Sequence, residues 1–241
     1  MKKVLVTLPV EPQHMSFFAS QVSDVPEEYE FTQKAADEVT AEDLADKQII
    51  LGSVEPELLA DAKSLEWLQI SWAGADSFVK PGVLPETAAL TNASGAYGLA
   101  VSEHMVAATF ALVRRLHQYA RNQQAHMWQS RGPITSVEGA KVLVLGLGDI
   151  GGRYARKMKA LGAYVIGLRR TEAAMPDWLD EQYTIDRLDE QLPRADIVGM
   201  VLPGGAATHH IMDERRLRLM KPGAYLVNCG RGNEIGRASC R

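Results

Sequence analysis

The chain has 241 residues, of which 46% are hydrophobic and 23% are charged. This composition is ordinary for a globular protein and fits one large domain or two smaller ones. The net charge of −4 disfavours nucleic acid as a partner, because phosphate binders usually carry a basic face. No apolar run approaches the roughly 18 residues of a membrane span. Two distant cysteines, Cys229 and Cys240, and the absence of a signal-peptide pattern indicate a reduced, cytoplasmic protein.

Short apolar runs recur at the beginning of the chain, and their length and β-branched content suit strands of a covered parallel sheet. The predicted strands are 3–9, 28–33, 47–52, 66–71 and 88–93. The segments between them are richer in Ala, Glu and Leu and fit crossover helices at 11–22, 40–46 and 55–64. Residues 1–93 are therefore predicted to form a flavodoxin-like α/β domain.

A single long helix is predicted to begin near Leu99 and to end at the Gly-Pro break of residues 126–133. Its side chains recur with the 4-3-4-3 spacing of one helix face. That face comprises Met105, Thr109, Leu112, Leu116 and Tyr119. A helix of this length would form a spine between two α/β units.

Alternation of strands and helices resumes at Lys141. Strands are predicted at 141–146, 163–168, 183–187, 195–203 and 224–230, and helices at 152–162 and 214–223. This order predicts a doubly wound Rossmann sheet. We expect residues 94–233 to form a nucleotide-binding domain.

The hexapeptide GLGDIG, residues 146–151, lies between a predicted strand and a predicted helix. Gly146 allows a tight turn, Gly148 lets the backbone approach a pyrophosphate, and Gly151 lets helix and strand pack closely. The N–H groups of the first helical turn, which includes Asp149 and Ile150, would face the negative charge. A tight turn without a ligand is the alternative, and the strand–turn–helix–strand order disfavours it.

The residues after the second strand of this domain predict which dinucleotide binds. An NAD enzyme usually has Asp or Glu at this point, bonded to the ribose hydroxyls. Here Arg169, Arg170 and Thr171 follow instead, and guanidinium and hydroxyl groups would hold a 2′-phosphate. The pattern predicts a preference for NADP(H), with NAD(H) still possible. A pair of solvated surface arginines is the alternative.

Four segments together resemble the D-isomer-specific 2-hydroxy-acid dehydrogenases. They are SWAGADSF (71–78), TNASGAYGLAVSEHM (91–105), GLGDIG (146–151) and LVNCGRG (226–232). The arginines after the second strand resemble those of the NADPH-using glyoxylate and hydroxypyruvate reductases of this family. The resemblance implies hydride transfer between NADP(H) and a small 2-oxo or 2-hydroxy acid. It also implies that the full-length protein is a homodimer, formed through the long helix and the nucleotide domain.

The resemblance assigns substrate contacts to three residues. Ala73 and Gly74 match a loop whose backbone N–H groups receive the substrate carboxylate, for which a plain turn is the alternative. Arg231 matches the family's catalytic arginine. One guanidinium can hold the carboxylate of a 2-oxo acid and polarise the neighbouring carbonyl as negative charge develops.

Further positions match contacts to the cofactor. Leu202 and Pro203 match a loop that lines the nucleotide, and Thr208 matches a nearby contact. Cys229 corresponds to a backbone position beside the nicotinamide, where Arg231 also lies. No metal is predicted: His209 and His210 are adjacent, share no helix face and read as loop residues.

The general-acid His and the Glu of the family follow the strand that bears the arginine, and Glu234 is too close to Arg231 to be that Glu. We therefore expect this chain to be C-terminally truncated, without its return helix. It should be nearly inactive, because losing a general acid costs about 10²–10⁴-fold in rate. The tail EIGRASCR (234–241) back-translates to a common sequencing-library adapter and is predicted to be non-native. Resequencing the locus tests this.

Two other functions fit the same predicted fold. One is a dinucleotide-sensing binding protein like the dehydrogenase-related corepressors, because fold alone does not define function. Arg231 and the 71–78 loop favour an enzyme instead. The other is NAD-dependent oxidation of formate or phosphoglycerate, which the arginines at 169 and 170 disfavour.

Overall fold

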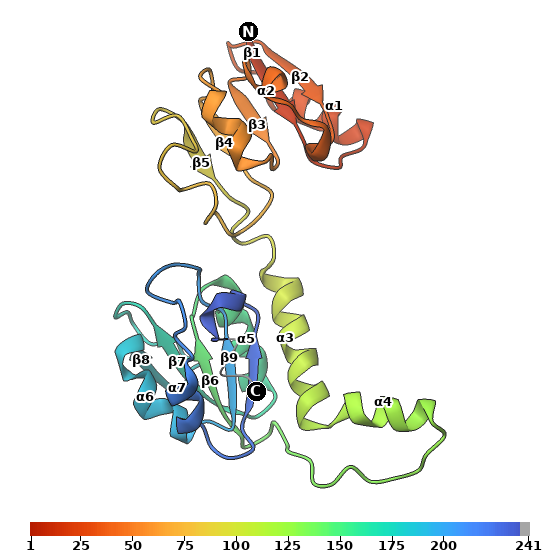
Figure 1. Cartoon of the computed structure of the whole chain (residues 1–241), viewed down its shortest axis with the longest axis vertical. Coiled ribbons are helices and arrows are strands. Elements are labelled where there is room, and N and C mark those ends of the chain that lie inside the picture. Colours follow the sequence, from red (N-terminus) through yellow and green to blue (C-terminus); the bar gives the residue numbers. More distant parts are fainter. Residues whose placement is uncertain (237–241) are drawn as a thin grey trace. The chain divides into compact units, whose positions relative to one another are not determined.

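The computed structural model describes residues 1–236 and divides the chain into two compact units. Unit 1 is Met1–Ala96, and unit 2 begins at Tyr97. Figure 1 shows that each unit contains one parallel β-sheet with helices beside it. Of the tail predicted to be non-native (234–241), residues 237–241 lie outside the described residues.

Unit 1 contains five parallel strands in the order β2-β1-β3-β4-β5. The strands are β1 (Lys2–Val6), β2 (Tyr29–Gln33), β3 (Ile49–Leu51), β4 (Trp67–Gln69) and β5 (Ala89–Thr91). The helices are α1 (Pro12–Gln21) and α2 (Ala41–Leu44), and 3-10 turns form at Ala36–Glu38 and Pro56–Asp61. This strand order is the flavodoxin-like one, so the predicted fold of this part is confirmed. The helix predicted at 55–64 is a 3-10 turn that ends where Ala62 leaves helical geometry (ψ 61°).

Unit 2 contains a second parallel sheet in the order β10-β9-β6-β7-β8. Its strands are β6 (Lys141–Leu145), β7 (Tyr164–Arg169), β8 (Glu181–Thr184), β9 (Ile197–Met200) and β10 (Tyr225–Asn228). Its helices are α3 (Gly98–Val113), α4 (Leu116–Gln124), α5 (Asp149–Ala160), α6 (Leu188–Gln191) and α7 (Glu214–Leu219). Counted within the unit, this order is 5-4-1-2-3, which is the doubly wound Rossmann arrangement expected from the sequence.

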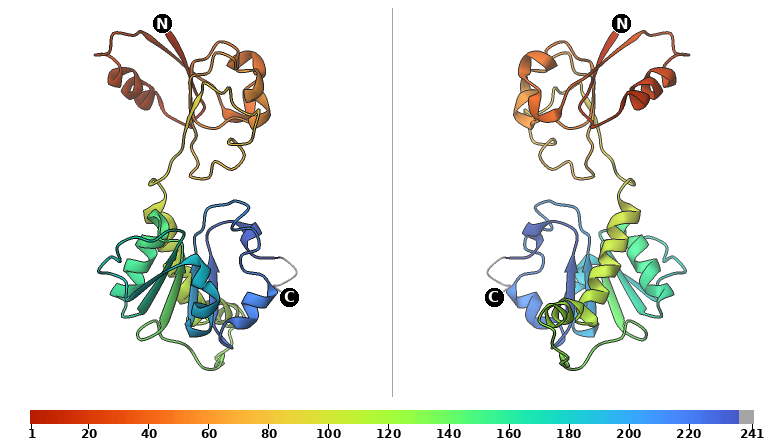
Figure 2. Two further views of the ribbon diagram at one scale, coloured as in Figure 1. Left: turned by 90° about the vertical axis from the view of Figure 1, so that its left-hand side faces the viewer. Right: turned by 90° about the vertical axis from the view of Figure 1, so that its right-hand side faces the viewer.

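Two apolar clusters lie on opposite faces of the unit 2 sheet. One joins the sheet to α3 and α5 and contains Met105, Tyr154 and Met158. The other contains Leu188 and Leu192, with Leu217 of α7 packed against it. Figure 2 shows α5 and α7 on opposite sides of the strands. Both faces are covered, which explains why the strands read as continuous apolar runs rather than alternating ones.

The prediction of one long helix after Leu99 is wrong, because the chain breaks between α3 and α4. Arg115 adopts a left-handed conformation (φ 55°), and the carbonyl of Val113 accepts the N–H of Thr135 at 3.1 Å. The Arg115 side chain also donates to the carbonyl of Arg131 at 2.5 Å. α4 therefore turns away from the sheet (Figure 1) and leaves Leu116 exposed.

Tyr154 links α5 to α3 in the core of unit 2. Its side chain is fully buried, and its hydroxyl lies 2.9 Å from the hydroxyl of Thr109. Burial raises the pKa of Tyr154 to about 12, because a phenolate is poorly solvated in the core. The unfolded chain therefore loses this proton at a lower pH than the folded chain does.

The contribution of the Tyr154 hydroxyl to the free energy of unfolding is therefore fully present below pH 10 and is lost as the pH rises through 12. We expect the free energy of unfolding to fall over this range by about 3 kcal/mol more in the wild type than in Tyr154→Phe, because one pKa unit is worth about 1.4 kcal/mol. At neutral pH, Tyr154→Phe should cost only about 1 kcal/mol, from the lost hydrogen bond. Urea unfolding of both chains across this pH range measures the difference. The prediction would be contradicted if the free energies of unfolding of the wild type and Tyr154→Phe changed in parallel with pH.

Candidate functional site

The carboxyl ends of four strands of unit 2 meet at one edge of the sheet. The N–H of Gly146 donates to the carbonyl of Leu168 at 2.9 Å, so the ends of β6 and β7 lie together. The loop after β9 is tied to β6 in the same way, from Val201 to Leu145 at 2.9 Å. The N–H of Cys229 donates to the carbonyl of Met200 at 3.0 Å and adds the end of β10. The residues assigned to the cofactor from the sequence follow these strands, at the edge where doubly wound sheets bind ligands.

The three glycines of the turn after β6 have different packing. Gly146 has a left-handed φ of 93°, and a Cβ there would lie 2.5 Å from the carbonyl oxygen of Val201. A Cβ on Gly151 would lie 1.8 Å from the carbonyl oxygen of Gly146. A Cβ on Gly148 would meet nothing within 4 Å. Gly146 and Gly151 are therefore needed for the turn itself, whereas Gly148 leaves open space above it.

The turn leads directly into α5, whose N-cap is Gly148. The first-turn N–H groups of a helix have no partner within the helix and carry a partial positive charge. Asp149 begins α5, but its side chain bonds Arg153 at 2.7 Å and lies against Gly98 at the start of α3. Ile150 is half-buried and packs on the core. The turn can therefore receive an anion at its backbone.

The two arginines at the end of β7 differ in their burial. Arg169 is the last residue of β7 and is half-buried. Arg170 and Thr171 are exposed. Arg169 also lines a hollow of about 480 Å³ between the end of β7 and β8. The guanidinium groups therefore present positive charge at the same edge as the glycine turn.

The loop after β9 is held in shape by Thr208. Its hydroxyl donates to the carbonyl of Pro203 at 2.8 Å and to that of Gly205 at 3.2 Å. Leu202 is buried and Pro203 is exposed at the sheet edge. In this structure Thr208 braces the loop that carries Leu202 and Pro203.

Asn228 organises the loop after β10 and was not singled out from the sequence. Its side chain accepts from the N–H of Gly230 at 2.8 Å and donates to the carbonyl of Arg231 at 3.0 Å. The sequence signal is an Asn two residues before Gly230, because Asn side chains often bond the backbone two residues on in turns. Arg231 is half-buried at this loop. Burial raises the pKa of the neighbouring Cys229 thiol, so this cysteine is a poor nucleophile.

Glu234 is buried directly behind the same loop. Its side chain is fully buried, and a Cβ on Gly230 would approach its carboxyl oxygens at 2.5 and 2.6 Å. Burial raises the pKa of Glu234. Nothing in the sequence indicated this burial, because an acidic residue in a glycine-rich loop is usually solvated.

The residues assigned to the substrate carboxylate lie in unit 1, whereas Arg231 lies in unit 2. Ala73 and Gly74 follow β4, and the side chain of Asn92 donates to the carbonyl of Ala73 at 2.7 Å. Gly74 lines a hollow of about 360 Å³, which Ser53 and Trp72 also line. The 71–78 loop is therefore an ordered part of unit 1 beside a small hollow.

The histidines lie outside this sheet edge or on its surface. The rings of His209 and His210 stack at 3.8 Å, and both residues are exposed. His104 is exposed on α3. Among residues 1–236, no group of three or more His, Cys, Asp or Glu side chains could hold a metal ion. Within the same range, no helix is long and apolar enough to cross a membrane.

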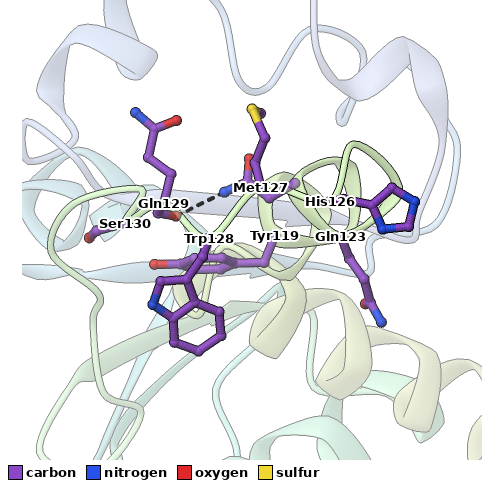
Figure 3. A pocket seen from close by; sticks show the side chains of 8 residues that line it. Tyr119, Gln123, His126, Met127, Trp128, Gln129 and Ser130 are labelled. Atoms are coloured by element: carbon purple, nitrogen blue, oxygen red, sulfur yellow. Dashed lines mark hydrogen bonds between the residues drawn. The ribbon is translucent and has the colours of Figure 1, made fainter.

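A larger hollow, of about 750 Å³, is formed by α4 and the residues that follow it. Figure 3 shows Tyr119, Met127 and Trp128 around it. Trp128 is fully exposed (105%), and Met127 is also exposed. This hollow belongs to the segment that turns away from the sheet.

A doubly wound sheet with a glycine turn, a helix N-terminus and arginines at one edge defines unit 2 as a dinucleotide-binding domain. Residues 106–239 match the family "D-isomer specific 2-hydroxyacid dehydrogenase, NAD binding domain". This chain belongs to the D-isomer specific 2-hydroxyacid dehydrogenase family, whose members are NAD(P)-dependent enzymes that act on CH–OH groups.

Individual relatives agree with this assignment. An uncharacterized protein of Corynebacterium melassecola is 31% identical over 79% of this chain, which covers 64% of that relative. A putative 2-hydroxyacid dehydrogenase of Haemophilus influenzae is 28% identical over 96% of this chain and 74% of its own length. A family member of known structure from Aeromonas salmonicida has a TM-score of 0.84 at 28% identity, covering 99% of this chain and 76% of that one. The chain thus spans about two thirds to three quarters of these relatives.

Proposed function

We propose that this chain is part of a reductase that transfers hydride from NADPH to a small 2-oxo acid, such as glyoxylate or hydroxypyruvate. Unit 2 binds the dinucleotide, and unit 1 contributes the loop that contains Ala73 and Gly74. The bound nicotinamide supplies the hydride. The backbone of the 146–151 turn and the first turn of α5 hold the pyrophosphate. Arg231 holds the substrate carboxylate and polarises its carbonyl.

The observation that carries the cofactor proposal is the positive charge after β7. Arg169 and Arg170 stand where an NAD enzyme places a carboxylate. A carboxylate would repel a 2′-phosphate, whereas guanidinium groups offer it paired donors. Arg170 is exposed and therefore accessible to a ligand at this edge.

We expect this chain to bind NADPH at least about tenfold more tightly than NADH, because a charge-assisted contact to phosphate is worth about 1.5–3 kcal/mol. Quenching of Trp emission measures both affinities. Trp178 is a suitable reporter because it packs against α5, 3.6 Å from the position of a Cβ on Gly152. Arg170→Gln should weaken the binding of NADPH about tenfold and leave the affinity for NADH unchanged.

Arg218→Gln is the matched control, because Arg218 lies on α7 and pairs with Glu214 on the same helix. It should leave both affinities unchanged. Equal binding of NADPH and NADH by the wild type would overturn the cofactor preference. Equal binding would still agree with a dinucleotide-binding fold.

Slow turnover is expected, because the described residues to which we assign a role include no general acid. We also propose a cytoplasmic location for the protein.

We further propose that the protein forms a homodimer through α4 and the segment that follows it. The fully exposed Trp128 and the exposed Met127 and Leu116 form apolar surface on this part of the chain. Large exposed aromatic side chains are typical centres of protein interfaces.

Trp128→Ser is expected to weaken self-association about 30-fold or more, because interface tryptophans typically contribute 2 kcal/mol or more. Sedimentation velocity over a range of concentrations measures the change. Phe17→Ser is the control, because Phe17 is an exposed aromatic side chain on α1 of unit 1. A wild-type chain that sediments as a monomer at all concentrations would overturn the proposal for this chain.

A further inference from the structure

Residues of β7 and β8 line the hollow beside Arg169. Arg169 is the register partner of Thr184 on β8, and Gln182 is the partner of Gly167. Side chains two residues apart along a strand lie on one face, so Gln182, Thr184 and Arg169 share a face of the sheet. All three line the hollow of about 480 Å³.

Two residues that line this hollow each have a buried polar atom without a hydrogen-bond partner. These atoms are Nε of Arg169, a donor, and Oε1 of Gln182, an acceptor. The amide orientation of Gln182 is set, because its Nε2 donates to the carbonyl of Ala173 at 2.6 Å. An unsatisfied buried polar atom costs about 1–3 kcal/mol. Such atoms are uncommon in native proteins, so an unpaired donor and an unpaired acceptor on residues that line one hollow point to a ligand.

The ligand must offer an acceptor to Arg169 and a donor to Gln182 at neighbouring positions. A ribose with a 2′-phosphate does so, because the phosphate oxygens accept and the adjacent 3′-hydroxyl donates. The hydroxyl of Thr184 supplies a further donor to the phosphate. Glu172 and Asp186 also line the hollow, but both are exposed, so water screens their repulsion of the phosphate.

We infer that Gln182 and Thr184 of β8 complete the 2′-phosphoribose site together with Arg169. Cofactor preference is then set by two strands rather than by the residues after β7 alone. This inference rests on the proposed NADP(H) preference. It adds two specificity-determining residues on a strand to which the sequence had assigned no function.

The test uses adenosine 2′,5′-bisphosphate and 5′-AMP as probes, with affinities measured by calorimetry on the whole chain. The variants are Gln182→Met and Thr184→Val, which keep similar size but remove the polar groups. Each variant should bind the bisphosphate about tenfold more weakly, as expected for the loss of one hydrogen bond to a buried or charged group. 5′-AMP should change less than about threefold, because no phosphate seats its ribose in the hollow. Gln13→Met, on exposed α1 of unit 1, is the control.

The outcomes separate this inference from the proposed function. A wild type that binds both probes equally overturns the NADP(H) preference itself. A wild type that prefers the bisphosphate, with variants that bind it normally, overturns only the role of β8. Should Gln182→Met fail to fold in a thermal unfolding scan, Gln182→Glu replaces it. Its added negative charge should weaken binding of the bisphosphate more than binding of 5′-AMP. Equal effects on the affinities for both probes would refute the inference.

Discussion

Replacing Gly151 with alanine is expected to lower the affinity for NADPH about 5- to 150-fold, because overpacking of this kind costs about 1–3 kcal/mol. The new Cβ would lie 1.8 Å from the carbonyl oxygen and 3.0 Å from the carbonyl carbon of Gly146. Both are backbone atoms of the turn, so no side-chain rotation relieves the clash. α5 must move away from β6, which displaces the first-turn N–H groups from the pyrophosphate.

Gly152→Ala is the matched control, one residue further along the same helix. Its Cβ would meet Trp178 at 3.6 Å, an ordinary contact. Alanine also favours helix over glycine by up to about 1 kcal/mol, so this variant should bind NADPH normally and unfold at the same or a higher temperature. Titration by Trp emission and thermal unfolding of both variants measure the contrast. A Gly151→Ala chain that binds within threefold of the wild type would refute the packing argument.

The sheet edge was predictable because its signals are local. An apolar run that ends in Gly146 indicates a covered strand followed by a turn, and Arg231 follows another such run. Parallel strands place their carboxyl ends at one edge. The sequence therefore predicted which segments meet there before any contact was known.

The break between α3 and α4 was not predictable in the same way. The 4-3-4-3 spacing continues through Leu116, and neither Arg114 nor Arg115 is a helix breaker. The break depends on Thr135, which is distant in sequence and bonds the carbonyl of Val113. A helix end set by a returning loop leaves no local trace in the sequence.

The residues of the proposed ribose site were likewise only partly predictable from the sequence. The sequence indicated Arg169, Arg170 and Thr171 as one group, but strand alternation and burial separate Arg169 from the exposed pair. Gln182 joins Arg169 only because β8 pairs with β7. Pairing partners and orphaned polar atoms are properties of the folded sheet, so only the structure reveals them.

Replacing Arg231 with glutamine is expected to slow reduction of a 2-oxo acid by about 10²–10³-fold, the usual effect of removing one group that stabilises a developing oxyanion. Glutamine keeps a donor but loses the charge and the paired geometry that one guanidinium offers to a carboxylate and a carbonyl together. Arg231→Lys should recover only part of the rate, because an ammonium is a point charge without that geometry. Single-turnover loss of NADPH absorbance, with glyoxylate or hydroxypyruvate and a high protein concentration, keeps slow rates measurable.

The loss in Arg231→Gln should fall on the chemical step more than on cofactor binding. The proposed pyrophosphate and 2′-phosphate contacts follow β6 and β7, whereas Arg231 follows β10. NADPH affinity should therefore change less than the rate does. Arg218→Gln, an exposed arginine paired with Glu214, should leave both quantities unchanged. Full recovery by lysine would show that the paired geometry of the guanidinium is not needed. A glutamine variant as fast as the wild type would show that Arg231 does not polarise the carbonyl. The enzyme would then be distinguished from a dinucleotide-binding protein only by residues elsewhere in the fold.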